Sequence, residues 1–484
     1  MKKFSKMPVI IFFILSLISL PGCNKDKGNK LTSSDNTITF SDEGGSYFLK
    51  ISTTAESWDL SIPADADWIK ASQASGTTGP ATVAIRATGN LSTATRTAKI
   101  TFSAPNAADL EIIVTQTGAL YPVYNTNPIK KDSTGMGRTA MQIAKNIKVG
   151  WNSVNTLEAI GGETAWGNPQ ITNNLISLVK QSGFNAIRLP CSWNQYADQA
   201  TGQIQSAWLE RVKTVIQYCL NNNLYVILNI HWDGGWLENN CTTAMQKQVN
   251  AKQKAFWEQI ATYMRDFDER LMFASANEPN VDNVTQMGVL LSYHQTFVNA
   301  VRSTGGRNFY RILVVQGPNT DMEKTRTLMD QLPTDSVPDR MMVEVHYYTP
   351  WNFCGMTQDE TWGNQFYYWG KNYHSTTDLA HNPTWGEEAT VISDFGLMKS
   401  KYTIQGIPVV LGEFGAIRRT NLTGDNLALH LASRAYFFKY IATQANADGL
   451  LPFIWDNDIF NRTSNTVADQ KSLDSLMVGA FGQK

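Results

Sequence analysis

Residues 271–279, Leu-Met-Phe-Ala-Ser-Ala-Asn-Glu-Pro, join a short apolar run to a polar ending. Similar apolar runs lie at 147–150, 186–189, 224–230, 312–315, 342–345, 409–411 and 450–454. The runs are continuous rather than alternating, which is typical of parallel strands that are buried on both faces. The sequence therefore predicts eight buried parallel strands.

Amphipathic stretches lie between several of these runs, at 171–182, 206–221, 251–265 and 427–445. Strands and helices that alternate over roughly 340 residues predict a (β/α)8 TIM barrel with insertions, which we place at 140–484. A doubly wound sheet is the alternative, but no Gly-rich phosphate-binding fingerprint follows the first strand.

Polar residues end six of the predicted strands. In such barrels the reactive side chains sit at the C-terminal ends of the strands. Burial of so many unpaired polar groups would be costly in a purely structural core, so the endings indicate a functional site. They are Arg188, His231-Trp232-Asp233, Asn277-Glu278-Pro279, His346-Tyr347-Tyr348, Glu413-Phe414-Gly415 and Trp455-Asp456.

Glu278 and Glu413, on the fourth and seventh strands, are expected to face each other across the barrel mouth. Two carboxyl groups that flank a bond are the machinery of glycoside hydrolysis. A retaining enzyme holds them about 5 to 5.5 Å apart, whereas an inverting enzyme needs about 6.5 to 9.5 Å. The sequence alone leaves this distance open.

Residues 276–280 and 411–415 resemble the acid/base and nucleophile segments of glycoside hydrolase family 5. The resemblance implies a retaining enzyme in which Glu278 is the acid/base, Glu413 is the nucleophile and Asn277 holds the sugar 2-hydroxyl. It also implies that Arg188 and Tyr348 hydrogen-bond Glu413 and keep it ionised. We expect burial without a direct cation to keep Glu278 protonated.

The same resemblance gives roles to further residues. His346 would lie near Glu278, His231 would line the floor, and Trp455 would stack under the sugar. Residues 150–159 and 163–169 look like the first-strand signature of subfamily 4, although Ser153-Val154 replaces the usual Leu-Gly. The resemblance and the aromatic loops together imply that Asn155, Trp232, Trp236, Trp351 and Trp455 bind substrate.

Subfamily 4 members act mainly inside β-1,4-glucan backbones, so the expected activity is that of an endo-acting glucanase, with xyloglucan as the favoured substrate. Mixed-linkage glucan and cellulose are the alternatives, and mannan fits less well. A surface glycan-binding lipoprotein without catalysis and a transglycosylase are the other functions to test. The long aromatic insertion at 347–396 is expected to shape the leaving-group side of the cleft.

Residues 37–118 contain short alternating runs separated by Gly, Asn and Ser clusters, which favour an immunoglobulin-like β-sandwich. The pattern of Trp68, Gly76, Asn90, Arg96 and 116–118 resembles the Bacteroidetes-associated carbohydrate-binding often N-terminal (BACON) domain. Its two tryptophans, Trp58 and Trp68, lie in alternating strands, so we expect them to be core residues and the domain to be a spacer. Residues 119–139 are expected to be a linker.

The first 23 residues predict export. Lysines precede an apolar run, and Leu20-Pro21-Gly22-Cys23 resembles a bacterial lipobox. This predicts a lipid on Cys23, a tether at 24–36 and a monomer anchored to the outer membrane, with periplasmic or outward display left open.

Charge and cysteine spacing exclude other functions. The net charge of −1 argues against a nucleic-acid partner. The remaining cysteines, Cys191, Cys219, Cys241 and Cys354, lack metal-site spacing, and the expected chemistry requires no cofactor or metal.

Overall fold

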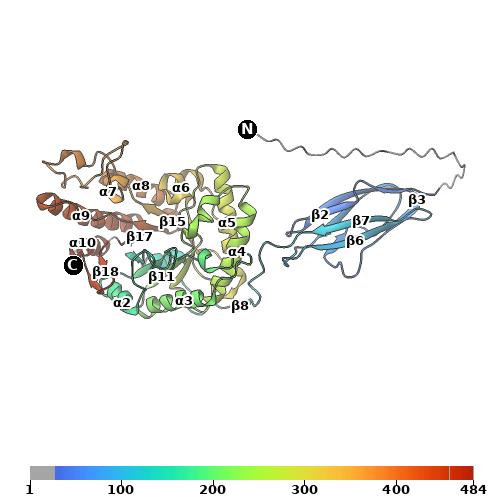
Figure 1. Cartoon of the computed structure of the whole chain (residues 1–484), viewed down its shortest axis with the longest axis horizontal. Coiled ribbons are helices and arrows are strands. Elements are labelled where there is room, and N and C mark those ends of the chain that lie inside the picture. The colour runs from blue at the N-terminus through green and yellow to red at the C-terminus, as the bar shows by residue number, and fades with distance from the viewer. Residues whose placement is uncertain (1–27, 457, 483–484) are drawn as a thin grey trace, which may run out of the picture. The chain divides into compact units, whose positions relative to one another are not determined.

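The computed structural model describes residues 28–456 and 458–482, and the chain divides into two compact units between Gly118 and Ala119. Each unit is described by itself (Figure 1). The signal peptide, Cys23 and the start of the predicted tether lie outside the described residues. Among the residues that are described, no helix combines the length and the apolar character needed to cross a membrane.

The N-terminal unit consists of β-strands that enclose one apolar core. Its strand order is β2-β7-β6-β3-β5-β4, with β1 paired to β3. Trp58 and Trp68 are both buried in this core, as expected. The strands are β1 (Leu31–Ser33), β2 (Thr37–Phe40), β3 (Gly45–Ser61), β4 (Ile69–Ala71), β5 (Ser75–Ala87), β6 (Arg96–Ser103) and β7 (Leu110–Gln116).

Strand β1 lies inside the segment that the sequence suggested was a tether. It pairs antiparallel with β3, where Leu31 is opposite Thr53 and Ser33 is opposite Ile51. The assignment of 31–33 to a tether is therefore wrong. The run is only three residues long, which is too short to show an alternating pattern.

Ala119–Lys484 form the (β/α)8 barrel that the sequence predicts. Eight parallel strands close in the order β9 to β12, then β14 to β17, and β17 pairs with β9. Their bounds are β9 (Gly150–Asn152), β10 (Ala186–Leu189), β11 (Tyr225–Asn229), β12 (Leu271–Ala274), β14 (Leu313–Gln316), β15 (Met341–Tyr347), β16 (Val409–Phe414) and β17 (Leu450–Trp455).

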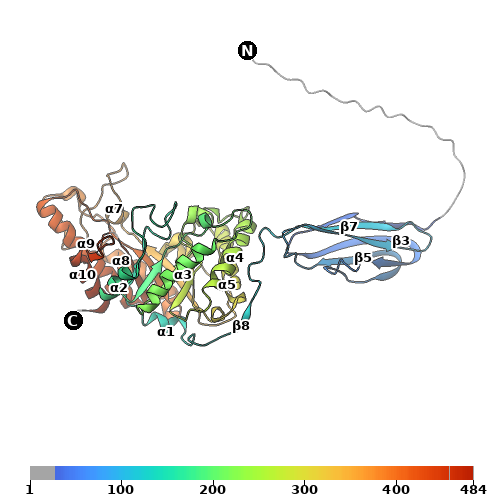
Figure 2. The ribbon, with the colours of Figure 1, turned by 60° about the horizontal axis from the view of Figure 1, so that its bottom comes forward.

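Helices cover the outside of this barrel, as the two views show (Figures 1 and 2). Several begin at a side-chain cap: Thr172, Asn283 and Asp321 each accept a hydrogen bond from a backbone N–H of the first turn. The outer helices are α2 (Asn173–Gln181), α3 (Ser206–Asn221), α4 (Gln246–Tyr263), α5 (Val284–Ser303), α6 (Met322–Leu328), α8 (Glu388–Lys401), α9 (Gly424–Asp448) and α10 (Gln470–Phe481). Two short helices are α1 (Ala140–Ala144) and α7 (Trp351–Cys354).

The interior of the barrel changes from apolar to polar along the strands. One apolar cluster joins α1 to the first inward residues of the strands, including Ala186, Val314 and Met342. Two residues further along the same strands stand Arg188, Gln316 and Glu344, all buried. Because side chains two apart in a strand share a face, the polar layer lies directly above the apolar one. The polar layer carries the site.

Ile147 was predicted to lie in the first strand, but β9 begins only at Gly150. Ile147 instead belongs to the apolar cluster that α1 forms with the strands. An apolar residue that is buried at the closed end of a barrel cannot be told from a strand residue by its hydrophobicity. The predicted start of the strand was therefore three residues too early.

The segment 119–139, which was predicted to be a linker, packs on the barrel. Tyr124 and Asn125 donate backbone N–H groups to the carboxylate of Glu258, at 2.8 and 3.1 Å. Strand β8 (Ile129–Lys131) pairs with β13 (Gly305–Gly306), and Arg138 binds Glu269. These contacts are long range, so Pro and Gly punctuation alone could not reveal them.

Candidate active site

A backbone irregularity in β16 positions Glu413. Leu411 is opposite Val345, but Glu413 is opposite His346, so Gly412 is an extra residue in the register with β15. Such bulges re-aim side chains and are common beside active sites. Gly412 also makes room for Glu344, because a β-carbon there would come within 2.0 Å of the Glu344 carboxylate.

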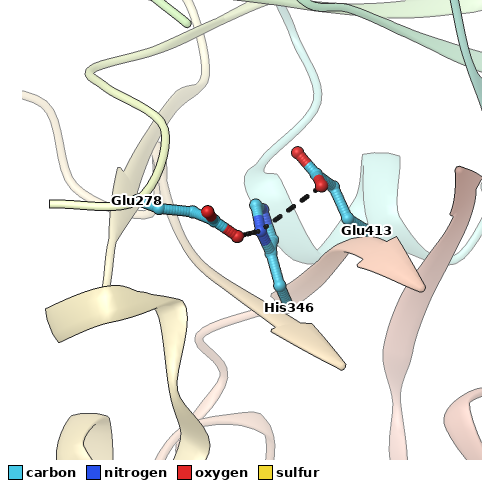
Figure 3. A group of neighbouring side chains, drawn as sticks. All are labelled: Glu278, His346 and Glu413. Atoms are coloured by element: carbon cyan, nitrogen blue, oxygen red, sulfur yellow. Dashed lines mark hydrogen bonds and ion pairs between the residues drawn. The ribbon is translucent and has the colours of Figure 1, made fainter. Parts of the chain in front are cut away.

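Glu278 follows β12 and reaches the same point from the other side (Figure 3). One carboxylate oxygen of Glu278, one of Glu413 and a nitrogen of His346 all lie within 4.8 Å of one another. The side chain of Glu278 is 45% exposed, whereas that of Glu413 is only 7% exposed. The separation is close to the roughly 5 to 5.5 Å of retaining enzymes and below the roughly 6.5 to 9.5 Å of inverting ones, so it favours the retaining arrangement.

Arg188 connects the groups around Glu413. This fully buried guanidinium donates to Glu413 Oε1 at 2.9 Å and to Asn277 Oδ1 at 2.8 Å, and it pairs with Glu344 Oε1 at 2.8 Å. Tyr348 donates its hydroxyl to the other oxygen of Glu413, at 3.0 Å. Both oxygens of Glu413 are therefore held by donors from different strands, which fixes the carboxylate in one orientation.

Asn277 is oriented from both sides. Its side-chain oxygen accepts from Arg188, and its backbone N–H donates to Glu238 at 3.3 Å. Because Arg188 occupies the oxygen, the side-chain NH2 is left as the donor group of Asn277. This is consistent with a donor for a sugar hydroxyl next to the carboxylate pair.

His346 lies between the acidic groups. Nδ1 is 2.7 Å from Glu278 Oε1 and 3.8 Å from Glu413 Oε2, while Nε2 is 3.2 Å from Glu344 Oε1. Burial alone would lower the pKa of this imidazole, but Glu413, Glu278 and Glu344 outweigh burial and raise the pKa to about 9. His346 therefore carries a proton at neutral pH.

The expected division of pKa values between the two glutamates is wrong. Burial acts to raise the pKa of Glu278, but the hydrogen bond and charge of His346 prevail and hold it below its usual range. Burial raises the pKa of Glu413, against the opposing charges of His346 and Arg188. The expectation assumed that no cation lies beside Glu278. The structure places protonated His346 there, 2.7 Å from its carboxylate.

His231 and Trp455 form the aromatic part of the site. Their rings stack with centroids 5.8 Å apart and planes inclined by 15°. Burial, together with the charges of Arg188 and His346, holds the pKa of His231 well below its usual range. A neutral imidazole therefore supports Trp455 at the end of β17.

Trp232 and Asp233 adopt strained backbone angles, with φ values of 31° and 55°. Asp233 holds this turn by accepting backbone N–H groups of Trp193 and Asn194, at 2.7 and 2.6 Å. The turn leaves Trp232 43% exposed. Strain of this kind is common at binding sites, where it presents a side chain that would otherwise be packed.

The other predicted substrate-binding residues lie in different surroundings. Asn155 lines a cavity of about 360 Å³ together with Asn168, Asp456 and Arg462. Trp351 is half exposed, and its ring meets Tyr348 edge to face at 6.4 Å. Trp236, by contrast, packs edge to face on Phe256 of α4 at 5.5 Å and adjoins the apolar core. Its contacts are those of a core residue.

The network around Arg188 includes two residues that were not among the predicted site residues, Glu344 and Asn152. Glu344 receives Gln316 Nε2 at 2.6 Å, and Asn152 accepts from Arg188 at 3.0 Å while donating to the Gly412 carbonyl at 2.8 Å. Glu344 lies inside β15, whereas Asn152 is the last residue of β9. The available signals were a charged residue inside the apolar run 342–345 and an amide two residues after the apolar run 147–150.

Glu278, His346 and Glu413 are also the kind of cluster that can ligate a metal ion. An imidazole must be neutral to ligate a metal, whereas the pKa of His346 is raised to about 9. The buried guanidinium of Arg188 adds a further positive charge beside Glu413. A metal ion here would have to displace a proton from His346 beside the positive charge of Arg188, whereas a pair of carboxylates that acts on an uncharged substrate can use these charges as they stand.

Comparisons with known proteins agree with this geometry. The family model "Cellulase (glycosyl hydrolase family 5)" matches residues 144–461, and the BACON N-terminal binding domain model matches residues 56–117. The chain is 34% identical to the xyloglucan-specific endo-beta-1,4-glucanase of Bacteroides ovatus, over 97% of this chain and 96% of that protein. It is 35% identical to endoglucanase A of Paenibacillus barcinonensis, over 78% of this chain and 99% of that protein.

A solved structure has a similar fold. The Bacteroides ovatus xyloglucanase in complex with a XXXG heptasaccharide superposes with a TM-score of 0.70 at 33% identity, covering 93% of this chain and 99% of that one. The matched family model covers more than half of the chain and includes both Glu278 and Glu413. The chain belongs to glycoside hydrolase family 5.

Proposed function

We propose that the protein is a retaining endo-β-1,4-glucanase that cleaves the backbone of xyloglucan. The observation that carries the proposal is the pair Glu278 and Glu413, with carboxylate oxygens within 4.8 Å and a separate set of partners for each. The choice of xyloglucan rests on the relatives named above, one of which is a xyloglucan-specific enzyme that matches almost the full chain.

In the first step Glu413 attacks the anomeric carbon, and the bond to the leaving oxygen breaks. Glu278 supplies the proton that the leaving oxygen requires, and His346, 2.7 Å from Glu278, is the local source of that proton. Arg188 and Tyr348 hold Glu413 in line during the attack. The products of this step are a shortened glucan and a glycosyl ester on Glu413.

In the second step water attacks the glycosyl ester from the side of the departed chain. Glu278 now accepts a proton from that water, the new bond from oxygen to the anomeric carbon forms, and Glu413 leaves as a carboxylate. Two inversions at the same carbon give overall retention. His346 returns Glu278 to its starting state by exchanging the proton again.

The substrate is tested by incubating the full-length protein with xyloglucan, mixed-linkage glucan, carboxymethyl cellulose and mannan. We expect the highest kcat/KM on xyloglucan, with a rapid fall in viscosity and short oligosaccharides as products. Higher kcat/KM on mixed-linkage glucan or cellulose would favour the second candidate, a general endoglucanase, which the similarity to an endoglucanase A supports. Lengthened chains would indicate a transglycosylase, and intact polymer would indicate a binding protein.

We further propose that Cys23 carries a lipid and that the enzyme is a monomer anchored to the outer membrane. The lipobox-like Leu20-Pro21-Gly22-Cys23 after an apolar run supports the lipid anchor. Labelled palmitate should enter the wild-type protein and should not enter Cys23→Ala, which should also leave the membrane fraction. Equal labelling of the two proteins would contradict the anchor, and protease treatment of whole cells would distinguish outward from periplasmic display.

A further inference from the structure

Three exposed tryptophans are grouped around the short helix α7 (Trp351–Cys354). Trp351 is 51% exposed, Trp362 is 64% exposed and Trp385 is 51% exposed. All three lie in the insertion that follows β15, whose orange segment projects from the barrel beside the label α7 in both views (Figures 1 and 2). Large aromatic side chains left this open in a folded enzyme indicate a binding surface.

Backbone contacts bring the other two tryptophans to α7. Next to Trp385, Gly386 lies so close to the Pro350 ring that a β-carbon would meet it at 2.8 Å. Near Trp362, Asn352 donates its side-chain amide to the carbonyl of Asn364 at 2.7 Å. Trp385 is therefore one residue along the chain from a contact with Pro350, and Trp362 is two residues from a hydrogen bond with α7.

Arg419 holds this assembly in place. The buried guanidinium donates to the backbone carbonyls of Asn352, Met356 and Phe366, at 2.9, 3.0 and 3.1 Å. Gln365 accepts a further hydrogen bond from the same group. A surface fixed in this way loses little conformational freedom when a ligand binds, and this favours affinity.

The same assembly is continuous with the catalytic pair. Trp351 contacts Tyr348, which donates to Glu413. The backbone N–H of Ile417, in the loop that follows Glu413, donates to the carbonyl of Cys354 at the end of α7. Two separate contacts therefore join α7 to the segment that carries the nucleophile.

We infer that Trp351, Trp362 and Trp385 form a sugar-stacking surface for the β-1,4-glucan backbone, which starts beside the catalytic pair at Trp351 and continues away from it at Trp362 and Trp385. Pyranose rings expose apolar C–H faces that pack on indole rings, and the equatorial linkage keeps these faces along an extended chain. The inference rests on the proposed function, since it assigns this surface to the polymer that the carboxylate pair cuts. Of these three tryptophans only Trp351 was among the predicted substrate-binding residues, so Trp362 and Trp385 are the new assignments.

The test uses the full-length double variant Trp362→Ala/Trp385→Ala with two substrates. KM for polymeric xyloglucan should rise roughly 10-fold, with kcat little changed, because stacking is lost away from the reacting atoms. Hydrolysis of an aryl β-cellobioside, which occupies only the sites beside the scissile bond, should keep its wild-type kcat/KM. The conservative double variant Trp362→Phe/Trp385→Phe should recover most of the polymer affinity.

Phe481→Ala is the matched control, since this side chain is an equally exposed aromatic at the end of α10. It should leave both substrates unaffected. An unchanged polymer KM in the double alanine variant would overturn the sugar-stacking surface, and so would a parallel loss on the aryl cellobioside. A wild-type enzyme that leaves every glucan intact would instead refute the proposed function, so the two failures are distinguishable.

Discussion

The sandwich and the barrel both bury polar side chains, but only the barrel leaves one side of its network open. In the sandwich, fully buried Gln116 donates to the carbonyls of Ser41 and Thr88 and accepts from Arg96. In the barrel, equally buried Arg188 holds Glu413 at the edge of a site where Glu278 is 45% exposed. A closed network can only stabilise the fold, whereas an open one can also present a reactive group.

The tryptophans show the same difference. Trp58 is buried in the sandwich against Phe102. Position 76 has room only for glycine, because a β-carbon there would lie 2.5 Å from the Trp58 ring. Trp232 and Trp351 of the barrel are about half exposed. Trp68, Asn90 and Gln116, through which the sandwich resembles its family, are also buried, and this supports a spacer role for that unit.

The largest expected effect is that of Glu413→Ala, which removes the attacking carboxylate. We expect kcat to fall by at least about 10⁴-fold, the scale seen when a covalent nucleophile is deleted. Xyloglucan binding, measured by calorimetry, should be largely retained. Glu323→Ala, which removes an exposed carboxylate on α6, is the control and should have no effect. Near-normal turnover by Glu413→Ala would refute the nucleophile assignment.

His346→Gln should reduce kcat/KM by about 10²-fold, because the proton source beside Glu278 is lost. In the wild type we expect kcat/KM to fall as pH rises through about 9, where His346 loses its proton. In the variant Glu278 must itself retain the proton, so the fall should begin at a lower pH. An unchanged alkaline limit would contradict the role of His346, and His374→Gln, at another histidine paired with a glutamate, is the control.

The raised pKa of His346 also links stability to pH. Its folded-state pKa of about 9 lies above the ordinary value of 6.5. The stabilisation is therefore complete below about pH 6.5 and is lost as pH rises through about 9. Thermal unfolding of wild type and His346→Gln across this range should show the difference between them shrinking toward alkaline pH.

Gln116→Ala should act on the sandwich alone. The substitution removes the acceptor of Arg96 Nε and one hydrogen bond at each of the Ser41 and Thr88 carbonyls, so we expect the free energy of unfolding of this unit to fall by about 2 kcal/mol. Calorimetry of the full chain should show an earlier transition, with kcat/KM on soluble xyloglucan unchanged. Thr97→Ala, at an exposed position of β6, is the matched control. Reduced catalysis in Gln116→Ala would show that the two units are coupled.

The smallest effect is expected from deletion of residues 1–118, which should leave rates on soluble substrates unchanged. Deletion of 1–139 is the informative contrast, because it also removes the backbone donors of 124–125 from Glu258 and the guanidinium of Arg138 from Glu269. Those carboxylates are buried, so the melting temperature of the barrel should fall only with the longer deletion. Capture of the isolated sandwich by insoluble polysaccharide would overturn the spacer role.

Much of the fold was predictable because strand and helix patterns are local. The ranges 186–189, 271–274 and 206–221 coincide with β10, β12 and α3. The strand β1 and the docking of 119–139 were missed, since both depend on partners far along the chain. In the site, polar residues at most strand ends were visible in the sequence, whereas Glu344 stood inside an apolar run and Asn152 ended a strand whose boundary was placed too early.

The sequence by itself determined the closed barrel and the side chains at its mouth, because apolar runs and their polar endings specify which residues are buried and where strands stop. Only the tertiary structure decided how those side chains act on one another. The extra residue Gly412 places Glu413 opposite His346, and His346 in turn reaches Glu278. Proton positions depend on distances of a few ångströms between residues far apart in the chain, and no local pattern encodes them.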